Sequence, residues 1–403
     1  MIDAGSYDYI VVGSGFFGAV MAERIANVLE RPVLVLERRG HFGGNSFSEQ
    51  DRATGIEYHR YGTHLFHTSS AEVWTWINRF SSFNNYRHRV LTRHRERMFT
   101  MPINLMTLNN FFNVDLRPSE AAEFLAARAA CEPFPQPRNL EEKAISLIGR
   151  ELYEAFIRGY TAKQWETDPR LLPAETIKRL PVRFNYNDFY FDDLHEGLPL
   201  DGYSAIFERI YADPRIRVVL NCDFFDVRHS IRPDARIIYT GPIDRYFGYR
   251  FGVLGWRTLD FEIERLAIAD YQGAAVVNYA DQTVPFTRIH EFKHLHPERR
   301  YGDEWTMIMR EFSRFASAED EPYYPINTQA DRNLYDRYAV LAEAEPNVLF
   351  GGRLGTYRYL DMHQAIGAAL KAFQNQILQP MHEDRREPSG SSVREFDTFS
   401  TRA

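Results

Sequence analysis

The chain has 403 residues, a net charge of −7 at pH 7 and a sequence pI of about 6.0. This length allows two or three domains, and the acidic balance argues against a protein that binds nucleic acid. Two cysteines, Cys131 and Cys222, provide neither a disulfide framework nor metal-ligand spacing, which indicates a reducing cytoplasm. Because we find no signal peptide and no apolar run of about eighteen residues, we expect a cytoplasmic protein without membrane insertion.

A glycine-rich turn near the N-terminus lies within a pattern of strand, helix, strand and acid. The pattern predicts a strand over 9–12, a helix over 19–29 and a second strand over 33–36. Gly13 permits the tight turn, Gly15 lets the backbone approach a pyrophosphate, and Gly18 lets helix and strand pack closely. Glu37 ends the second strand, where it can accept hydrogen bonds from a ribose. We therefore predict a dinucleotide site; the alternative is a glycine-rich turn in an ordinary α/β unit.

A later glycine pair indicates which dinucleotide is bound. Gly43 and Gly44 follow the ribose acid closely. Such a pair resembles the FAD-binding oxidase and hydroxylase superfamily, in which the backbone folds back over the cofactor's phosphates. Residues 237–241 predict a strand ending in Thr-Gly, similar to a third flavin-contacting stretch of that superfamily. The cofactor domain is therefore expected to be discontinuous; the alternative for the glycine pair is a plain surface loop.

Two histidines and a basic segment come next in the chain. His64 and His67 lie in a glycine-led apolar stretch, where a pair of histidines favours a functional role over a satisfied core position. We expect no metal there, because no carboxylate or cysteine partner lies nearby in the sequence. Residues 87–97 are strongly basic. They form either a solvated strand face or a rim that attracts an anionic substrate, with His88 facing the site.

The next stretch, 105–165, predicts a helical insertion. Asn139, followed three residues later by Glu142, is typical of a capping box. An apolar stripe at helical spacing then runs from Ile145 to Phe156.

The insertion ends in aromatic residues. Phe156, Tyr160 and Trp165 form either core packing or a wet wall for a flat base, and the interruption by Gly159 and Thr161 favours the wall. We expect Trp165 to lie on a mobile loop that closes over a substrate.

The remaining chain predicts further strands and one last helix. Strands are expected over 275–279, 285–291, 306–311 and 348–350, and residues 178–191 are expected to begin a sheet. Asp361 is a natural N-cap for a helix that begins at Met362, and this helix N-terminus could stabilise negative charge on a flavin ring. Residues 381–403 are polar and low in aliphatic side chains, which predicts a disordered tail.

Together these elements predict an α/β fold. A discontinuous FAD-binding Rossmann-like domain is expected to carry an inserted helical domain and an antiparallel β-sheet substrate domain. The expected boundaries are 1–85, 200–247 and 326–380 for the FAD-binding domain, 100–170 for the helical insertion, and 86–99, 171–199 and 248–325 for the sheet domain.

Eight ordered motifs together resemble one family, the bacterial UDP-galactopyranose mutases. They lie at 7–15, 41–45, 61–68, 159–165, 181–184, 239–244, 321–325 and 361–364. The resemblance implies a flavin-dependent isomerase that interconverts UDP-galactopyranose and UDP-galactofuranose for cell wall biosynthesis, without net redox change. It also implies FAD, reduced by NADPH or another reductant, whose N5 attacks the anomeric carbon. This agrees with the lack of a convincing side-chain nucleophile with a paired base. A homo-oligomer is expected.

The resemblance assigns roles to single residues. Arg179 and Arg288 match arginines that grip the diphosphate, and His64 matches a histidine beside the flavin; these three are the expected catalytic residues. Substrate contacts are expected from Phe156, Ile157, Tyr160, Thr161, Trp165, Tyr190, Asn278, Tyr324, Tyr359, His88 and Arg353. Cofactor contacts are expected from Gly13, Gly15, Phe17, Gly18, Glu37, Arg38, Gly44, Asn45, His64, Thr240, Gly241, Gly352, Arg353, Asp361 and Met362. Ile157 and His88 differ from the residues of some relatives.

Two other functions remain open at this stage. The first is a flavin amine-oxidase-like oxidoreductase, which would need an apolar substrate cage. The second is a non-catalytic nucleotide-sugar binding protein, which would bind UDP without turnover.

Overall fold

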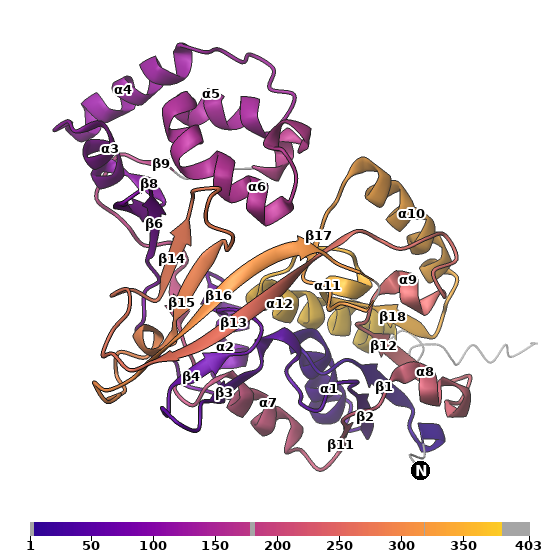
Figure 1. The fold of residues 1–403 in the computed structure, drawn as a ribbon. Coiled ribbons are helices and arrows are strands. Elements are labelled where there is room, and N and C mark those ends of the chain that lie inside the picture. Colours follow the sequence, from indigo (N-terminus) through magenta and orange to yellow (C-terminus); the bar gives the residue numbers. More distant parts are fainter. Residues whose placement is uncertain (1–3, 178–181, 318, 381–403) are drawn as a thin grey trace, which may run out of the picture.

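The computed structural model describes residues 4–177, 182–317 and 319–380 and confirms the expected α/β architecture (Figure 1). The predicted tail at 381–403 lies outside these residues. Among them, no helix is long and apolar enough to cross a membrane.

A five-stranded parallel sheet forms the lower part of Figure 1. Its order is β11 (Ile216–Val219), β2 (Val33–Leu36), β1 (Tyr9–Val12), β12 (Arg236–Tyr239) and β18 (Val348–Phe350). All four strand pairs are parallel. The apolar runs of β1 and β2 suit strands with both faces covered. Because the strands come from separated stretches of chain, this sheet is discontinuous, as predicted.

Helices cover this sheet, among them α1 (Phe16–Val28), α7 (Tyr203–Tyr211) and α12 (Met362–Phe373). The first begins at Phe16 rather than at the predicted Ala19, because Gly15 is already its N-cap, with extended backbone (φ −71, ψ −177). It packs against both α12 and α7. The helix therefore starts directly at the glycine turn, which brings its free N–H groups there.

A seven-stranded sheet crosses the middle of the molecule. Its order is β17 (Tyr324–Pro325), β13 (Trp256–Leu266), β16 (Thr306–Phe315), β15 (Arg288–Glu291), β14 (Val276–Tyr279), β6 (Val90–His94) and β7 (Arg97–Met101). It is mixed rather than purely antiparallel, because β14 and β6 run parallel. The long helical stretch between these two strands allows the crossover that parallel pairing needs. The strand β13 was missing from the prediction.

Residues 182–199 contribute no strand to this sheet, contrary to the prediction over 178–191. Instead β9 (Val182–Arg183) pairs with β8 (Ile103–Asn104), and β10 (His195–Gly197) pairs with β5 (Phe66–Thr68). Asn185 Oδ1 accepts from the N–H of Asn187, and Asn187 Oδ1 accepts from that of Phe189, at 2.9 and 3.1 Å. These local bonds replace a sheet ladder. Residues 178–181 lie outside the described part.

The helical region stands above the large sheet (Figure 1). It consists of α3 (Leu105–Phe112), α4 (Pro118–Ala130), α5 (Leu140–Leu152), a π-helical turn (Tyr153–Arg158) and α6 (Gly159–Trp165). Asn139 caps α5, since its side chain accepts from the N–H of Glu142 at 2.9 Å. The predicted capping box is not completed, because the Glu142 carboxylate accepts from the N–H and guanidinium of Arg138 instead. The region has a hydrophobic core of its own, which includes Leu125, Ile145 and Leu152.

Further helices and strands lie outside the two large sheets and the helical region. Among them are α2 (Ala71–Ile77), α8 (Phe224–Val227), α9 (Ile243–Tyr246), α10 (Gln329–Glu343), α11 (Gly352–Gly355), and the antiparallel pair β3 (Ser48–Gln50) and β4 (Glu57–His59).

Candidate active site

A cavity of about 230 Å³ lies at the carboxyl ends of β1, β2 and β12, where open α/β sheets bind their ligands. Most of the predicted cofactor residues line it: Gly13, Gly15, Phe17, Gly18, Glu37, Arg38, Gly44, Asn45, His64, Thr240, Gly241, Gly352, Arg353 and Met362. Asp361 lines a second cavity instead.

The glycine turn has room for a pyrophosphate. Gly13 has a φ of +96°, a left-handed conformation, and a Cβ at Gly18 would lie 2.0 Å from the Gly13 carbonyl oxygen. A Cβ at Gly15 would meet no atom of the chain closer than 3.9 Å. Contacts within the chain therefore explain why glycine stands at Gly13 and Gly18. They do not explain glycine at Gly15, where the absence of a side chain leaves space for a ligand to approach the backbone.

Glu37 braces this turn and keeps capacity for a ribose. Its Oε2 accepts from the N–H and the hydroxyl of Ser14 at 3.0 and 2.6 Å, and its Oε1 accepts from the N–H of Arg39 at 2.9 Å. A carboxylate has about four acceptor sites, so one remains for a ligand hydroxyl. The residues present thus fit an FAD molecule.

A second cavity, of about 1260 Å³, is lined by residues of the helical region, the large sheet and the loop before α12. Of the predicted substrate residues it contains Tyr160, Trp165, Tyr190, Asn278, Tyr324, Tyr359, His88 and Arg353, together with the predicted catalytic residues Arg288 and His64. The two cavities share Asn45, His64, Arg353 and Met362, so they meet at these side chains.

An ion pair of Arg288 and Glu311 lies in the wall of the second cavity. Arg288 Nε is 3.3 Å from Glu311 Oε1, and Arg288 Nη2 donates to the Tyr160 hydroxyl. Burial alone would raise the pKa of Glu311, but the charge of Arg288 and a hydrogen bond from His290 outweigh it and lower this pKa to about 2. Glu311 is therefore an anion that orients Arg288, whose guanidinium keeps further N–H groups for a phosphate.

His64 is a neutral imidazole with a defined tautomer. Its Nδ1 lies 2.7 Å from the Gly62 carbonyl oxygen, which can only accept, so Nδ1 carries the proton and Nε2 has a free lone pair. Burial lowers the pKa of His64 to about 4. Its backbone N–H donates to His59 Nδ1 at 2.9 Å, which fixes the loop. His64 thus offers both cavities a hydrogen-bond acceptor.

Arg353 is held in place where the two cavities meet. Its Nη1 donates to the Tyr323 carbonyl at 2.9 Å and its Nη2 to the Leu360 carbonyl at 2.7 Å. The guanidinium also lies 4.9 Å from the ring centroid of Tyr359. Arg353 therefore presents a fixed positive charge to both cavities.

Three predicted substrate residues lie away from the cavity wall. The Phe156 ring packs 5.1 Å from that of Phe99 in the helical core, Ile157 packs against the same core, and Thr161 is buried. For Phe156 this is the core packing that the sequence left open, since it continues the apolar stripe that begins at Ile145. A π turn over 153–158 links this stripe to α6. The other predicted catalytic arginine, Arg179, lies outside the described residues.

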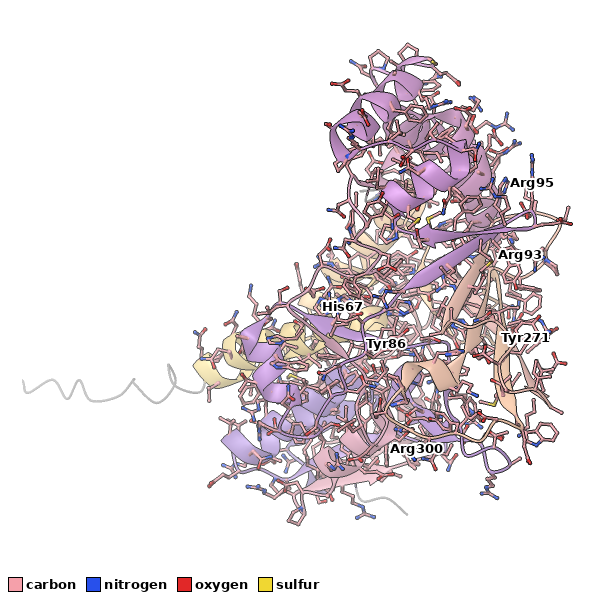
Figure 2. All side chains as sticks on the ribbon, turned by 90° about the vertical axis from the view of Figure 1, so that its left-hand side faces the viewer. His67, Tyr86, Arg93, Arg95, Tyr271 and Arg300 are labelled. Carbon is pink, nitrogen blue, oxygen red and sulfur yellow. The ribbon has the colours of Figure 1, made fainter. Side chains whose placement is uncertain are left out.

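The basic segment is mostly a solvated strand face. Arg93, Arg95 and Arg97 are exposed, and Figure 2 shows Arg93 and Arg95 at the edge of the molecule. From this segment His88 and Val90 line the second cavity. Burial lowers the pKa of His88 to about 3, so its imidazole is neutral.

Sequence reasoning missed two acidic residues of the site. Glu311 orients Arg288, as described above, and nothing in its sequence context marks it. Glu321 lines the first cavity, and its Oε2 accepts from Arg39 Nη2 at 2.7 Å. It stands in 321–325, one of the eight motifs that resemble the mutase family, and this is the signal that could have identified it.

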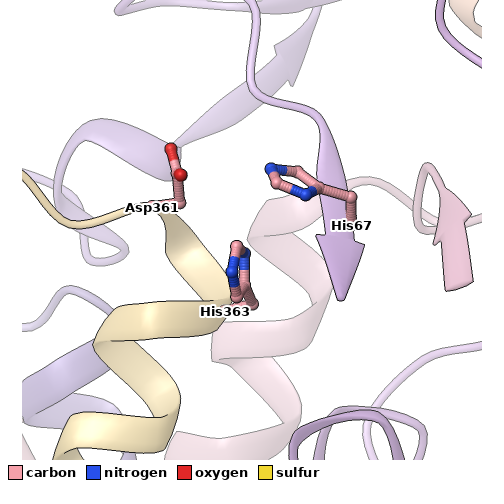
Figure 3. Close-up of side chains that lie close together, drawn as sticks. All are labelled: His67, Asp361 and His363. Carbon is pink, nitrogen blue, oxygen red and sulfur yellow. The ribbon is translucent and has the colours of Figure 1, made fainter. Parts of the chain in front are cut away.

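His67 has acidic neighbours that the sequence did not predict. His67, Asp361 and His363 come close together, with one potential ligand atom from each within 4.8 Å of the others (Figure 3). In addition, His67 Nδ1 donates to Asp193 Oδ2 at 2.6 Å. Partners nearby in the sequence are therefore not the only ones that count, because Asp193 and Asp361 reach His67 from distant parts of the chain.

Comparisons with known proteins agree with this geometry. The family model for UDP-galactopyranose mutase matches residues 155–359, and a model for an NAD(P)-binding Rossmann-like domain matches residues 11–80. The chain is 42% identical over 363 residues to a probable UDP-galactopyranose mutase of Klebsiella pneumoniae, covering 90% of this chain and 92% of that one. It is 37% identical over 369 residues to a dTDP-fucopyranose mutase of Escherichia coli, covering 91% and 97%.

A solved structure shares the fold. A crystal structure of a reduced UDP-galactopyranose mutase matches with a TM-score of 0.68 and 16% identity, over 91% of this chain and 93% of that chain. The matched family region, 155–359, includes both the aromatic end of the helical region and the strand β15 that carries Arg288. The chain therefore belongs to the UDP-galactopyranose mutase family of flavin-dependent isomerases.

Proposed function

We propose that the chain interconverts UDP-galactopyranose and UDP-galactofuranose, without net redox change, when its FAD is reduced. The observation that carries the proposal is the meeting of the two cavities at Asn45, His64, Arg353 and Met362. A substrate whose diphosphate binds beside Arg288 can reach the cofactor cavity with its sugar. This suits a reaction at the anomeric carbon, the sugar atom that carries the diphosphate.

The second cavity offers suitable groups for each part of such a substrate. The rings of Tyr160 and Trp165 suit a flat base. The two-pronged guanidinium of an arginine and the hydroxyls of tyrosines are hydrogen-bond donors that suit the diphosphate. We assign the base to Tyr160 and Trp165, the diphosphate to Arg288, Tyr190, Tyr324 and Tyr359, with Arg179, and the sugar to Asn278 and His88.

The side chains of the site control charge during the reaction. When bound and reduced, FAD supplies an electron-rich nitrogen, N5, for a bond to the anomeric carbon. Arg288 stabilises the diphosphate as it leaves. Met362 begins α12 and lines the cofactor cavity, where the helix N-terminus favours negative charge on the ring. Neutral His64 can accept a hydrogen bond at Nε2 from a bound cofactor or substrate.

Incubation with UDP-galactofuranose under anaerobic conditions tests the proposal. We expect UDP-galactopyranose to form after reduction of the flavin with dithionite, with no reductant consumed per turnover and no product with oxidised flavin. Robust turnover with oxidised flavin would contradict the proposed chemistry. Binding of UDP without turnover would identify a nucleotide-sugar binding protein, and stoichiometric oxygen consumption with an amine would identify an oxidase.

A second candidate substrate is dTDP-fucose. The observation that favours it is the 37% identity to a dTDP-fucopyranose mutase, over 97% of that protein. The two substrates differ by a methyl group on the base, the ribose 2′-hydroxyl and the sugar 6-hydroxyl. We expect a higher kcat/KM with UDP-galactofuranose than with dTDP-fucofuranose in parallel assays; the reverse order would reassign the substrate.

We further propose a cytoplasmic protein that is reduced by NADPH or another reductant and forms a homo-oligomer. Free Cys131 and Cys222 suit a reducing compartment. Stopped-flow reduction with NADPH tests the reductant, and light scattering tests the assembly.

A further inference from the structure

The last turn of α6, which carries Trp165, is tied to the large sheet through Lys163. The Lys163 Nζ donates to the backbone carbonyls of Tyr279, Asp281, Val284 and Phe286 at 2.7, 3.0, 3.0 and 2.9 Å. An ammonium has three N–H donors, so these four acceptors surround it and share its protons. We call this group the Lys163 cage.

The cage acceptors all lie at the end of β14 or in the turn between β14 and β15. This hairpin also carries Asn278 and Arg288, both in the wall of the second cavity. A Cβ at Gly159 would lie 2.2 Å from the Ala280 carbonyl oxygen, so the helix backbone packs directly on the turn. Lys163 itself does not line either cavity. It can therefore act on a substrate only through the residues that it holds.

Glu166 makes a second attachment just beyond Trp165. It ends α6 with a φ of 44°, and its Oε2 accepts from Arg257 Nη1 at 3.0 Å and from the N–H of Phe315 at 2.8 Å. The Arg257 side chain is 1% exposed, and Glu166 compensates the positive charge that it buries. The Ser313 hydroxyl also donates to the Gln164 carbonyl at 2.7 Å.

Trp165 lies between these two attachments. It is the last residue of α6 rather than part of a loop, contrary to the sequence-based expectation. Tyr160 lies on the same helix, and its hydroxyl accepts from Arg288. The two aromatic residues and Arg288 thus belong to one connected body, held by contacts within the chain.

We propose that Lys163 and Glu166 are positioning residues that dock the end of α6 on the sheet and so preform the wall that binds the nucleotide part of the substrate. This deepens the proposed function and rests on it for the identity of that nucleotide. A preformed wall loses less entropy when the ligand binds, and loosening it weakens binding.

The test compares Lys163→Met with a matched control, Lys293→Met, in the FAD-loaded protein. Lys293 Nζ donates to one carbonyl, that of Ala269, outside both cavities. We expect Lys163→Met to raise the Kd for UDP and the KM about tenfold, with kcat reduced less than threefold and FAD content unchanged. Lys293→Met should stay within twofold of wild type. Glu166→Gln should raise the Kd for UDP about fivefold.

Two further measurements separate positioning from general damage and from the identity of the substrate. Alkylation of Lys163→Cys with 2-bromoethylamine restores an ammonium of nearly the same reach and should recover UDP binding, with wild type treated in parallel. Acrylamide quenching of the Trp165 fluorescence, taken as the difference from Trp165→Phe in each background, should increase in Lys163→Met without ligand. If quenching and UDP binding in Lys163→Met equal those in Lys293→Met, the inference is overturned. If quenching increases in Lys163→Met but the wild-type protein shows no mutase activity, the positioning role stands and only the proposed function is overturned.

Discussion

At the scale of single residues, burial beside a partner decides which side chains carry charge. Glu311 stays ionised in the wall of the second cavity because Arg288 lies beside it. His64 and His88 stay neutral because burial penalises their cations. The site therefore combines a fixed ion pair with neutral imidazoles, which suits an anionic diphosphate next to an uncharged sugar.

Removal of Arg288 is expected to abolish most of the activity. Arg288→Ala removes a charge-assisted contact worth about 2–4 kcal/mol and should lower kcat/KM by roughly 30- to 1000-fold. Arg288→Lys should also be poor, because a point charge cannot span two oxygens. Steady-state assays with reduced flavin measure the effect, and the flavin absorbance should be unchanged.

Arg310→Ala is the matched control for this prediction. Arg310 lies on the neighbouring strand β16, pairs with Glu264 at 2.8 Å and lines neither cavity. Equal activities of the Arg288 and Arg310 variants would remove Arg288 from the site.

His88 is expected to make the fold sensitive to acid. Its pKa is about 3 in the folded protein but near the ordinary 6.5 when unfolded, so below pH 6.5 the unfolded state binds the extra proton. The free energy of unfolding therefore decreases as the pH falls from 6.5 towards 3, by about 2 kcal/mol at pH 5 from this residue. Urea unfolding at pH 7 and pH 5 measures how much free energy of unfolding is lost on acidification. This loss should be smaller in His88→Gln than in wild type by that amount, whereas His229→Gln, which changes an exposed residue, should match wild type. An unchanged loss in His88→Gln would mean that His88 is protonated in the fold.

At the scale of elements, irregular turns decide which residues reach the cavity. The π turn over 153–158 joins α5 to α6, so the aromatic stripe of the sequence divides into two groups. Phe156 enters the helical core, whereas Tyr160 and Trp165 line the second cavity. The wall predicted for a flat base is therefore shorter than the aromatic stripe.

Phe156 and Tyr160 are expected to respond differently to substitution. Phe156→Ala removes a ring that is 4% exposed and should lower the free energy of unfolding by about 3–5 kcal/mol, with little change in the Kd for UDP. Tyr160→Phe should weaken UDP binding at nearly unchanged stability, since it removes only the hydroxyl that accepts from Arg288. Denaturation curves and calorimetric titrations with UDP measure both. A large loss of UDP affinity in a stably folded Phe156→Ala variant would return Phe156 to the binding wall.

At the scale of the whole molecule, the second cavity is assembled from parts far apart in the sequence. The helical region provides Tyr160 and Trp165, the large sheet provides Arg288, and the segment before α12 provides Tyr359. A ligand in this cavity therefore contacts several parts of the fold at once.

Amide hydrogen exchange is expected to show this assembly directly. Addition of UDP to the FAD-loaded protein should slow exchange both in α6 (159–165) and in β15 (288–291), because the ligand stabilises the same body from two sides. The helix α4 (118–130), on the far side of the helical core, provides the internal reference and should not change. Slowing confined to one of the two stretches would show that they do not move as one body.

By itself the sequence determined the cofactor half of the protein. The strands around the glycine turn, the turn itself and the helix capped at Asp361 follow from local periodicity and backbone chemistry, which a single stretch of chain contains. The resemblance to the family likewise predicted substrate roles for Arg288, Tyr324 and Arg353, and all three line the second cavity.

Only the tertiary structure decided which of these residues act together. Glu311 beside Arg288, and Lys163 among carbonyls as far as 123 residues away, depend on contacts between distant segments. Phe156 packs in the helical core with Ile145 and Leu152, which decides between the two readings that the sequence left open for it. Such contacts depend on how elements pack in space, and local sequence patterns carry no information about that packing.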